Sequence, residues 1–328
     1  MTTFRAWVVR EADGANKSSL EDVDLNMLDD LDTVIRVTHS SINYKDALAL
    51  NGRPGVVRRT PLIAGIDATG EVLRTMHPRW NVGDTVTLNG AGLGEHLHGG
   101  LAEFAHVNGG DLVPVPTEFT PAQAAAIGTA GFTAALALDT LESRGLTPTG
   151  GPVLVTGAGG GSGSIAIALL AASGYEVVAA TGRPEILQER LKALGATDVI
   201  DRRELEKQTR PLGTQRWAGV IDSVGGRVLA GALAELEHGA AAAAFGLASS
   251  AELPTTVLPF ILRGIALLGI ESVRATPAVR AAAWERLRRD LSPRHIDDLT
   301  RVVSLENAKQ AAGELLEGRG TGRIVVEL

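Results

Sequence analysis

Val153-Leu-Val-Thr-Gly-Ala-Gly-Gly-Gly-Ser-Gly-Ser-Ile-Ala-Ile-Ala-Leu-Leu170 is the stretch that decides the fold of this chain. Its apolar, β-branched start leads into a glycine-dense turn, and small and aliphatic residues then continue without a helix breaker until Gly174. The pattern predicts a strand, a tight turn and a helix. Glycines let a pyrophosphate approach the amide N–H groups of such a turn, and the helix N-terminus adds partial positive charge. The stretch therefore predicts a dinucleotide site, although a run of Gly, Ser and Ala can also be a linker.

The glycine spacing fits the dinucleotide fingerprint G-x-G-x-x-G best when an alanine takes the first glycine position. In this register the whole turn faces the phosphates of the ligand. The residues predicted to bind the cofactor here are Ala158, Gly159, Gly160, Gly161, Ser162 and Gly163.

The segment after this helix indicates which dinucleotide is bound. Glu176-Val-Val-Ala-Ala-Thr181 reads as a second buried strand and runs into Gly182-Arg183, with no carboxylate before Glu185. A unit that binds NAD places an acidic residue here for the ribose 2′-hydroxyl, whereas an arginine pairs with the 2′-phosphate of NADP. We therefore predict NADPH as the cofactor, contacted by Thr181, Gly182 and Arg183. An arginine that is merely solvated at the end of a strand is the alternative.

The composition is that of an ordinary globular protein with room for two domains. The chain has 328 residues, of which 45% are hydrophobic and 21% charged, and its formal net charge is −7. It contains no basic block to hold a nucleic acid, and no apolar run comes near the length needed to span a bilayer. The N-terminus lacks the layout of a signal peptide. These features predict a cytoplasmic enzyme without nucleic-acid or membrane partners.

The order of the remaining segments predicts two kinds of sheet. Up to about residue 116 the chain consists of short β-like runs broken by Gly, Pro and Asn, which is typical of a small antiparallel barrel. From residue 120 an alanine-rich helix is followed by alternating strands and helices, the pattern of a doubly wound parallel sheet. Residues 280–289 read as a surface helix, and residues 322–328 as a terminal strand that returns to the first domain. The predicted strands are 5–9, 33–38, 70–73, 84–88, 101–105, 153–155, 176–181, 219–222, 241–245 and 266–270.

Several motifs together resemble the medium-chain dehydrogenase/reductase superfamily. The glycine turn is followed by Leu194-Gly195-Ala196, by Asp222-Ser-Val-Gly225 and by a closing Gly-Arg-Ile-Val-Val strand. More narrowly, four segments resemble the quinone-oxidoreductase-like branch that contains the NADPH-dependent acrylyl-CoA reductases. These segments are Ser40-Ser-Ile-Asn-Tyr-Lys-Asp-Ala-Leu48, Ile127-Gly-Thr-Ala-Gly-Phe-Thr-Ala134, Ala180-Thr-Gly-Arg183 and Leu253-Pro-Thr-Thr-Val-Leu-Pro-Phe-Ile-Leu262.

The resemblance covers essentially the whole chain and implies a fold, an activity and an assembly. The implied fold is α/β, with a GroES-like antiparallel β-barrel catalytic domain at 1–120 and a Rossmann NADPH-binding domain with a doubly wound parallel sheet at 121–270. Residues 271–328 return to the catalytic domain. The implied protein is a zinc-free homodimer that transfers a hydride from NADPH to an activated C=C bond. Its substrate is an enoyl-CoA or a quinone, and the reduction of acrylyl-CoA to propionyl-CoA is the leading reaction.

The residues themselves predict no metal site. The chain has no cysteine, which excludes thiolate zinc sites together with disulfides. Zinc-using relatives of the superfamily carry Gly-His-Glu where this sequence reads Gly65-Ile66-Asp67. We interpret Glu95-His96-Leu97-His98 as a loop with solvated histidines, and His39 as a hydrogen-bonded structural side chain.

Conjugate reduction without a metal needs a donor for the enolate oxygen and a source for the proton. An amide or a phenol can donate to an oxyanion, and the resemblance also places Tyr44 against the cofactor. The alternatives are that Asn43 caps the following helix and that Tyr44 packs between the domains. Lys45 and Asp46 pair with each other or with the helix start, and Arg323 either binds the substrate or is an ordinary surface arginine. The predicted catalytic residues are Asn43, Tyr44, Asp46 and Arg323.

Further cofactor contacts are implied by the resemblance. Thr129 precedes a crossover helix, and Gly246 and Leu247 end a parallel strand. Phe260 and Ser272 lie in segments that could close over the nicotinamide. Ser162 departs from the family, which usually has valine before the last glycine of the turn, and adds a hydroxyl near the phosphates. These further predicted contacts are Thr129, Gly246, Leu247, Phe260 and Ser272.

Two other functions are compatible with the same residues. A broad-specificity NADPH quinone or enone oxidoreductase needs the same hydride donor and oxyanion site as a thioester reductase. A non-catalytic NADPH-binding sensor is the second, because a fold alone does not imply catalysis. The sequence determines neither the acyl chain length nor the proton donor.

Overall fold

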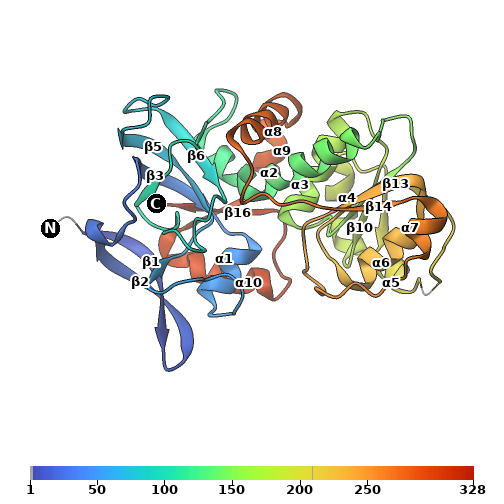
Figure 1. Ribbon diagram of the computed structural model, residues 1–328, viewed down its shortest axis with the longest axis horizontal. Helices are drawn as coiled ribbons and strands as arrows, with labels where there is room; N and C mark the ends of the chain where they lie inside the picture. The colour runs from blue at the N-terminus through green and yellow to red at the C-terminus, as the bar shows by residue number, and fades with distance from the viewer. Residues whose placement is uncertain (1–2, 209) are drawn as a thin grey trace. The chain divides into compact units, whose positions relative to one another are not determined.

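The computed structural model describes residues 3–208 and 210–328, and the chain divides into two compact units (Figure 1). The first unit comprises Met1–Phe132, Ser272–Arg288 and Ser292–Leu328, and the second comprises Thr133–Glu271 and Arg289–Leu291. Each unit has hydrophobic clusters of its own.

The second unit is built on a parallel sheet with the strand order β11-β10-β9-β12-β13-β14. Numbered along the unit this order is 3-2-1-4-5-6, so the predicted doubly wound sheet is confirmed, and the order reverses between β9 and β12. The strands are β9 (Val153–Thr156), β10 (Val177–Thr181), β11 (Asp198–Asp201), β12 (Trp217–Asp222), β13 (Leu236–Ala244) and β14 (Ala266–Gly269).

The central strands of this sheet are apolar because both of their faces are covered. Every residue of β9 and β10 is buried, which is typical of parallel strands between layers of helices. Strand β11 was not predicted because it is short, partly exposed and begins and ends with aspartate. The helices of this unit are α3 (Gly161–Ala172), α4 (Pro184–Ala193), α5 (Arg203–Glu206), α6 (Gly226–Ala234) and α7 (Leu258–Arg263).

The first unit contains two sheets. One has the order β2-β1-β4, and the other has the order β15-β16-β3-β5-β6-β8, with β7 also paired to β3. All pairs are antiparallel except β15 with β16. As predicted, the C-terminal strand β16 returns to pair with β3 (Figure 1). The strands are β1 (Thr3–Ala12), β2 (Ala15–Asp24), β3 (Thr33–Ser41), β4 (Leu62–Ile63), β5 (Asp67–Thr75), β6 (Thr85–Asn89), β7 (Phe104–Val107), β8 (Val113–Pro114), β15 (Thr300–Ser304) and β16 (Arg323–Glu327).

Among the described strands of this unit, β2, β4, β8 and β15 were not predicted, and β7 is shifted from its predicted position. Strand β2 was missed because its sequence is mostly polar, yet it pairs with β1 along its whole length. Asp13 and Gly14 both have positive φ, at 56° and 73°, which is the conformation of a tight hairpin turn. Strand β7 starts three residues later than the predicted 101–105, because Leu101 and Ala102 are buried in the connection before it.

The predicted surface helix at 280–289 is present, with residues 281, 282, 285, 288 and 289 exposed. This helix, α8, is longer than predicted and buries four side chains, including a guanidinium. The remaining helices of the unit join its strands. They are α1 (Tyr44–Leu50), α8 (Pro277–Asp290), α9 (Pro293–Leu299) and α10 (Ala308–Leu316), with short 3-10 helices at Leu25–Met27 and Leu305–Asn307.

Helix α2 (Pro121–Ser143) contradicts the expectation that no apolar segment approaches membrane-spanning length. By length and composition alone it could cross a bilayer, but 83% of its most apolar window is buried within the protein. Gly128 also interrupts its helical conformation. A mostly buried core helix meets the same criterion, so the finding is weak support for a membrane span.

Candidate active site and nucleotide turn

A buried carboxylate, Asp67, lies at the centre of a polar network in the first unit. It is the first residue of β5 and is fully buried. Its oxygens accept hydrogen bonds from Ser41 Oγ at 2.6 Å, Asn43 Nδ2 at 2.7 Å and Asn89 Nδ2 at 2.9 Å. The backbone N–H and the hydroxyl of Thr129 donate to it as well, at 2.9 and 2.7 Å. Asp67 therefore ties together a strand end, a helix start and the broken helix α2.

Arg323 is the cation of this network and is only 3% exposed. Its Nη2 donates to Ser41 Oγ at 2.9 Å, its Nη1 to Asn43 Oδ1 at 3.2 Å, and its Nε to the carbonyl of Ala126. Burial lowers the pKa of the guanidinium, against the attraction of Asp67. The sequence alternative of an ordinary surface arginine is therefore wrong.

Asp46 is a second buried carboxylate beside Asp67. It accepts the backbone N–H of Asn43 at 2.8 Å and that of Ile66 at 2.8 Å, so it holds the start of α1 against the loop that leads into β5. Burial, and then the negative charge of Asp67, raise the pKa of Asp46 to about 7. Because Asp46 is 1% exposed, it can order the site but has almost no accessible surface.

Gly128 makes the approach of α2 to the carboxylate possible. Its φ of 47° and ψ of −158° break the helix and turn the N–H of Thr129 toward Asp67. A Cβ at position 128 would lie 2.7 Å from Asp67 Oδ2, 2.9 Å from Ser41 Oγ and 3.0 Å from Arg323 Nη2. Only glycine combines this backbone conformation with such a close approach.

Tyr44 differs from the other predicted catalytic residues in being exposed, at 41%. It begins α1, whose N-cap is Asn43, and the amide of Asn43 is engaged with Asp67 and Arg323. Asn43 is therefore both the N-cap of α1, as one of the sequence alternatives proposed, and a member of the Asp67 network. Lys45 pairs with neither expected partner but with Glu95, at 2.6 Å.

The predicted solvated histidines behave differently from one another. His96 is exposed, whereas His98 is 4% exposed and its Nδ1 accepts the N–H of Ile63 at 3.0 Å, so the prediction is wrong for His98. His39 Nδ1 lies 3.0 Å from the hydroxyl of Thr38, as expected for a structural side chain. Among residues 3–208 and 210–328, no group of three or more His, Asp or Glu side chains is arranged to hold a metal ion.

In the second unit the glycine turn lies between β9 and α3 and depends on close backbone packing. A Cβ on Gly163 would lie 2.4 Å from the carbonyl oxygen of Gly157, so the last glycine of the fingerprint lets the helix pack against the turn. Gly157, not Ala158, takes the positive φ of 62°. Ala158 and Gly163 are buried, which leaves the residues between them as the accessible part of the turn.

The start of α3 fits an anionic ligand. The N-cap Gly160 is exposed, has no side chain to cap the helix, and is followed by a helix of 12 residues. The first N–H groups of a helix have no partner within the helix, and together they attract negative charge. Gly159, Gly161 and Ser162 are partly accessible beside Gly160, so the turn can take the pyrophosphate of a dinucleotide.

Two arginines, the predicted Arg183 and also Arg202, lie near the end of β10. The N–H of Arg183 donates to Thr181 Oγ1 at 3.3 Å, and Gly182 is exposed. A Cβ at Gly182 would lie 3.1 Å from Nε of Arg202, which follows β11. The sequence prediction missed Arg202 because it missed β11; an arginine directly after that strand was the available signal.

The two central strands of the sheet are tied together where the strand order reverses. Asp222, at the end of β12, is buried and accepts the hydroxyl of Thr156 at 2.5 Å and the N–H of Gly225 at 2.8 Å. Burial raises the pKa of Asp222. Gly246 packs so closely on this turn that a Cβ would lie 2.0 Å from the carbonyl oxygen of Ser223. Ligands of doubly wound sheets bind beyond these strand ends.

The other predicted cofactor residues lie in different settings. Leu247 is 55% exposed, just beyond Gly246. Phe260, on α7, packs against the hydrophobic cluster of the second unit. Ser272 is half-buried and belongs to the first unit.

Two family models match the chain, and relatives match it over nearly its full length. The alcohol dehydrogenase GroES-like domain matches residues 29–117, and the zinc-binding dehydrogenase model matches residues 161–289. The acrylyl-CoA reductase AcuI of Ruegeria pomeroyi is 44% identical over 328 residues, which are 99% of each chain. YhfP of Bacillus subtilis, which is described as a quinone oxidoreductase, is 46% identical over 297 residues, which are 90% of each chain.

Solved structures agree with these matches. The yhdH oxidoreductase from Salmonella enterica in complex with NADP has a TM-score of 0.95 and 43% identity, covering 99% of each chain. The structure of YhfP with NAD bound has a TM-score of 0.94 and 43% identity, covering 100% of each chain.

A GroES-like unit combined with a Rossmann unit defines the class of medium-chain dehydrogenases/reductases. Within this class, the chain belongs to the quinone-oxidoreductase-like family that includes AcuI and YhfP.

Proposed function

We propose that the protein is an NADPH-dependent reductase that transfers a hydride to the activated C=C bond of an α,β-unsaturated thioester. Acrylyl-CoA is the proposed substrate and propionyl-CoA the product. The observation that carries this proposal is the 44% identity to an acrylyl-CoA reductase over 99% of both chains. Relatives named as oxidoreductases and a similar structure with NADP support the reaction class.

The glycine turn of the second unit is the part of the chain that would hold NADPH. Its accessible residues, 159–162, suit the pyrophosphate, and Arg183 and Arg202 suit the 2′-phosphate. When bound, NADPH supplies the hydride. The roles of the remaining predicted contacts stay proposals: Tyr44, Thr129, Ala158, Gly163, Thr181, Gly182, Gly246, Leu247, Phe260 and Ser272.

In the first unit, the chain supplies a donor to the substrate oxygen through Tyr44. Its phenol is exposed, and a phenol can both stabilise an oxyanion and pass on a proton. Asn43, Asp46 and Arg323 act as positioning residues, because their polar groups hold the loop that presents Tyr44. A fixed donor is more effective than a mobile one, since it needs no reorganisation during the reaction.

Measuring NADPH oxidation by the purified protein tests the function. Acrylyl-CoA is expected to give a higher kcat/KM than simple quinones, and a chelator is expected to leave the rate unchanged. The opposite ranking would favour the quinone and enone oxidoreductase, which the similarity to YhfP supports as the second candidate. Cofactor binding without turnover of any enoyl-CoA, enone or quinone would identify a sensor.

Replacing the Tyr44 hydroxyl is expected to slow the reaction. Tyr44→Phe should lower kcat about tenfold or more, which is about 1.4 kcal/mol of barrier, if the hydroxyl stabilises the transition state. Steady-state kinetics with acrylyl-CoA measure this effect. Tyr175→Phe is the control, because that hydroxyl is bonded to Glu142 in the second unit. Equal rates for Tyr44→Phe and the parent protein would leave Tyr44 with a packing role.

The arginine at the end of β10 is expected to select the cofactor. Arg183→Ala should raise the KM for NADPH about tenfold or more while changing that for NADH little, because a charge-assisted bond to the 2′-phosphate is lost. Arg202→Ala is expected to act in the same direction. Arg203→Ala is the control, since its exposed side chain pairs with Asp201. Equal losses for both cofactors would contradict the assignment.

We also propose a cytoplasmic homodimer with the domain division at 120 and 270 described above. Strand β14 is the last strand of its sheet, and an open edge can pair with a second copy. The neighbouring segment 257–262 supports this assembly, because Val257, Ile261 and Leu262 are 67%, 68% and 59% exposed.

A further inference from the structure

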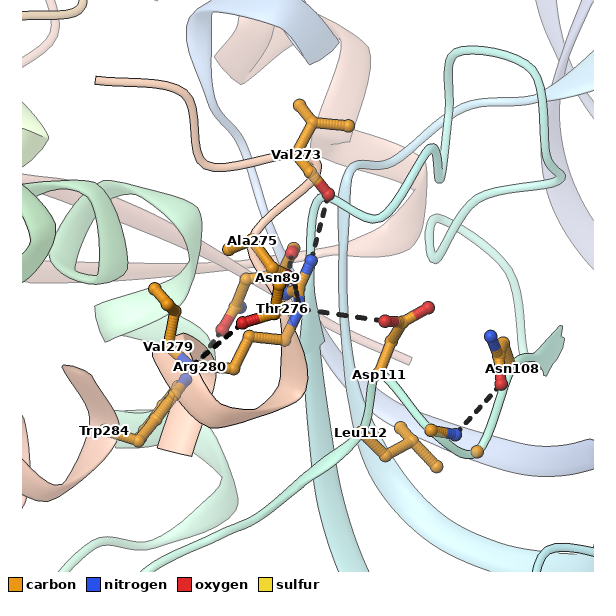
Figure 2. A network of polar contacts seen from close by, with 12 residues as sticks. Asn89, Asn108, Asp111, Leu112, Val273, Ala275, Thr276, Val279, Arg280 and Trp284 are labelled. Atoms are coloured by element: carbon orange, nitrogen blue, oxygen red, sulfur yellow. Dashed lines mark hydrogen bonds and ion pairs between the residues drawn. The ribbon is translucent and has the colours of Figure 1, made fainter. Parts of the chain in front are cut away.

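Helix α8 buries two polar side chains that take no direct part in the proposed reaction. Arg280 and Trp284 are each 2% exposed and lie one helical turn apart, so they share one face of the helix. Both donate hydrogen bonds to Asn89, the last residue of β6 (Figure 2). Asn89 therefore joins α8 to the sheet that carries Asp67.

Arg280 fixes the main chain of Asn89. Its Nη1 donates to the carbonyl of Asn89 at 2.6 Å (Figure 2). Its Nη2 and Nε donate to the carbonyls of Val273 and Ala275, at 3.0 and 3.1 Å. Gly90, which has a φ of 69°, packs so closely that a Cβ on it would lie 3.2 Å from Cα of Val273. The main chain at the end of β6 is therefore held firmly against the segment that leads into α8.

Trp284 fixes the side chain of Asn89. The amide Oδ1 accepts the indole N–H of Trp284 at 3.0 Å, and the amide Nδ2 donates to Oδ1 of Asp67 at 2.9 Å. An indole N–H can only donate and an ionised carboxylate can only accept, so both partners define the same orientation of the amide. Asn89 is 2% exposed, which leaves water little access to replace either partner. The amide thus transmits the position of α8 to Asp67.

Asp67 in turn holds the loop that presents Tyr44. Its Oδ2 accepts Nδ2 of Asn43 at 2.7 Å, and Asn43 directly precedes Tyr44. The side chain of Tyr44 is 41% exposed, so its direction depends on the turn that carries it more than on packing around the ring. A displacement of Asp67 would therefore be felt by Tyr44.

We propose that Asn89 and Trp284 are positioning residues of the reductase. They act through Asp67, which holds the loop that carries Tyr44. The inference rests on the proposed function and extends its site to the buried face of α8. A donor that is held in a fixed direction needs little reorganisation in the transition state. Loss of one link is therefore expected to slow the chemical step and to leave substrate binding intact.

Two matched tryptophan variants test the link from α8. Trp284→Phe removes the indole N–H that orients Asn89, and Trp80→Phe removes another buried indole N–H of the first unit, which donates to the carbonyl of Gly109 at 2.7 Å. Both variants are expected to lose a similar amount of thermal stability. Only Trp284→Phe should lower kcat with acrylyl-CoA, by about fivefold, with the KM values for acrylyl-CoA and NADPH unchanged. Equal kcat values for the two variants would overturn the proposal.

A double variant tests whether Trp284 acts through Tyr44. In a Tyr44→Phe background the hydroxyl to be positioned is already absent, so Trp284→Phe should lower kcat further by less than about twofold. If the full loss of about fivefold persists in this background, Trp284 does not act through Tyr44 and the proposal is wrong.

Asn89→Asp breaks the same link from its other side. The new carboxyl group keeps an acceptor for Trp284 but replaces the donor to Asp67 with an oxygen. The charged groups that contact this position are Asp67 from β5 and Arg280 from α8, and the parent protein contains both. The ratio of the variant's kcat to that of the parent should therefore be low at pH 8 and recover toward pH 5, where the protonated carboxyl again donates to Asp67. A ratio that does not change with pH would contradict the donor role of Asn89.

Fluorine NMR separates this proposal from the proposed function, because it needs no turnover. The chain has 2 tyrosines, so incorporation of 3-fluorotyrosine gives one resonance for Tyr44 and one for Tyr175, which Tyr44→Phe assigns. Trp284→Phe should shift the Tyr44 resonance and leave that of Tyr175, in the second unit, unchanged, whereas Trp80→Phe should shift neither. If the parent does not reduce acrylyl-CoA but the shift is seen, the proposed function fails and the link from α8 to Tyr44 stands. An unshifted Tyr44 resonance in Trp284→Phe would disprove the link whatever the activity.

Discussion

Replacing Arg323 with methionine is expected to lower the free energy of unfolding by about 3–5 kcal/mol, because it leaves buried carboxylates without the nearby cation and buried acceptors without their donors. Arg323 is 3% exposed and is the cation beside the carboxylates Asp46 and Asp67. Methionine keeps most of the volume of the side chain but leaves two buried carboxylates without their cation.

The loss should depend on pH. The pKa of Asp46 is already raised to about 7 from its ordinary value of 3.8, so the native state keeps a proton that the unfolded chain has released. The stability contributed by this group therefore falls as the pH rises from about 4 to 7. Removing Arg323 raises the carboxylate pKa further, so the destabilisation should be larger at pH 8 than at pH 5.

Urea unfolding at the two pH values measures both effects. Arg301→Met, on an arginine whose side chain is 52% exposed, is the control and is expected to change stability by no more than about 0.5 kcal/mol. A loss for Arg323→Met that equals the control, or that is larger at pH 5, would contradict the role of Arg323 in balancing the carboxylates.

Gly128→Ala is expected to destabilise the protein by about 2 kcal/mol or more and to reduce reductase activity. The positive φ of 47° strains any residue with a Cβ. The added methyl group would also lie within 3.0 Å of polar atoms of Asp67, Ser41 and Arg323, so the network must open. A displaced network would no longer hold the loop that carries Tyr44.

Thermal unfolding and turnover with acrylyl-CoA measure the two consequences. Gly14→Ala is the control that separates backbone strain from steric overlap with the network. Gly14 also has positive φ, but a methyl group added there would meet nothing within 4 Å. Its stability loss is expected to be about 1 kcal/mol, with unchanged turnover. If the two variants behaved alike, the close packing of Gly128 on the network would be unimportant.

Much of the second unit could be predicted because its signals are local. The order of strand, glycine turn and helix is encoded in one continuous stretch, and buried parallel strands such as β9 and β10 are apolar up to a final threonine. The prediction failed where a strand is polar. Strand β11 was missed for this reason, and Arg202 was missed with it.

The candidate site was only partly predictable. Asn43, Tyr44, Asp46 and Arg323 were selected from family motifs, but Asp67 was regarded only as a departure from a zinc motif. No local pattern distinguishes a buried carboxylate from an exposed one. The same limit explains why Arg280 was placed on a surface helix and His98 in solvent.

By itself the sequence determined the doubly wound sheet, the nucleotide turn and the family of this protein, because periodicity and glycine spacing act over short stretches of chain. Only the tertiary structure decided which polar groups meet. Arg323 and Ser41 are hydrogen-bonded although 282 residues separate them, and Thr129 reaches Asp67 across 62 residues. Such contacts depend on how β16, β3, β5 and α2 pack together, and burial makes each of these polar groups require a partner that no neighbouring residue supplies.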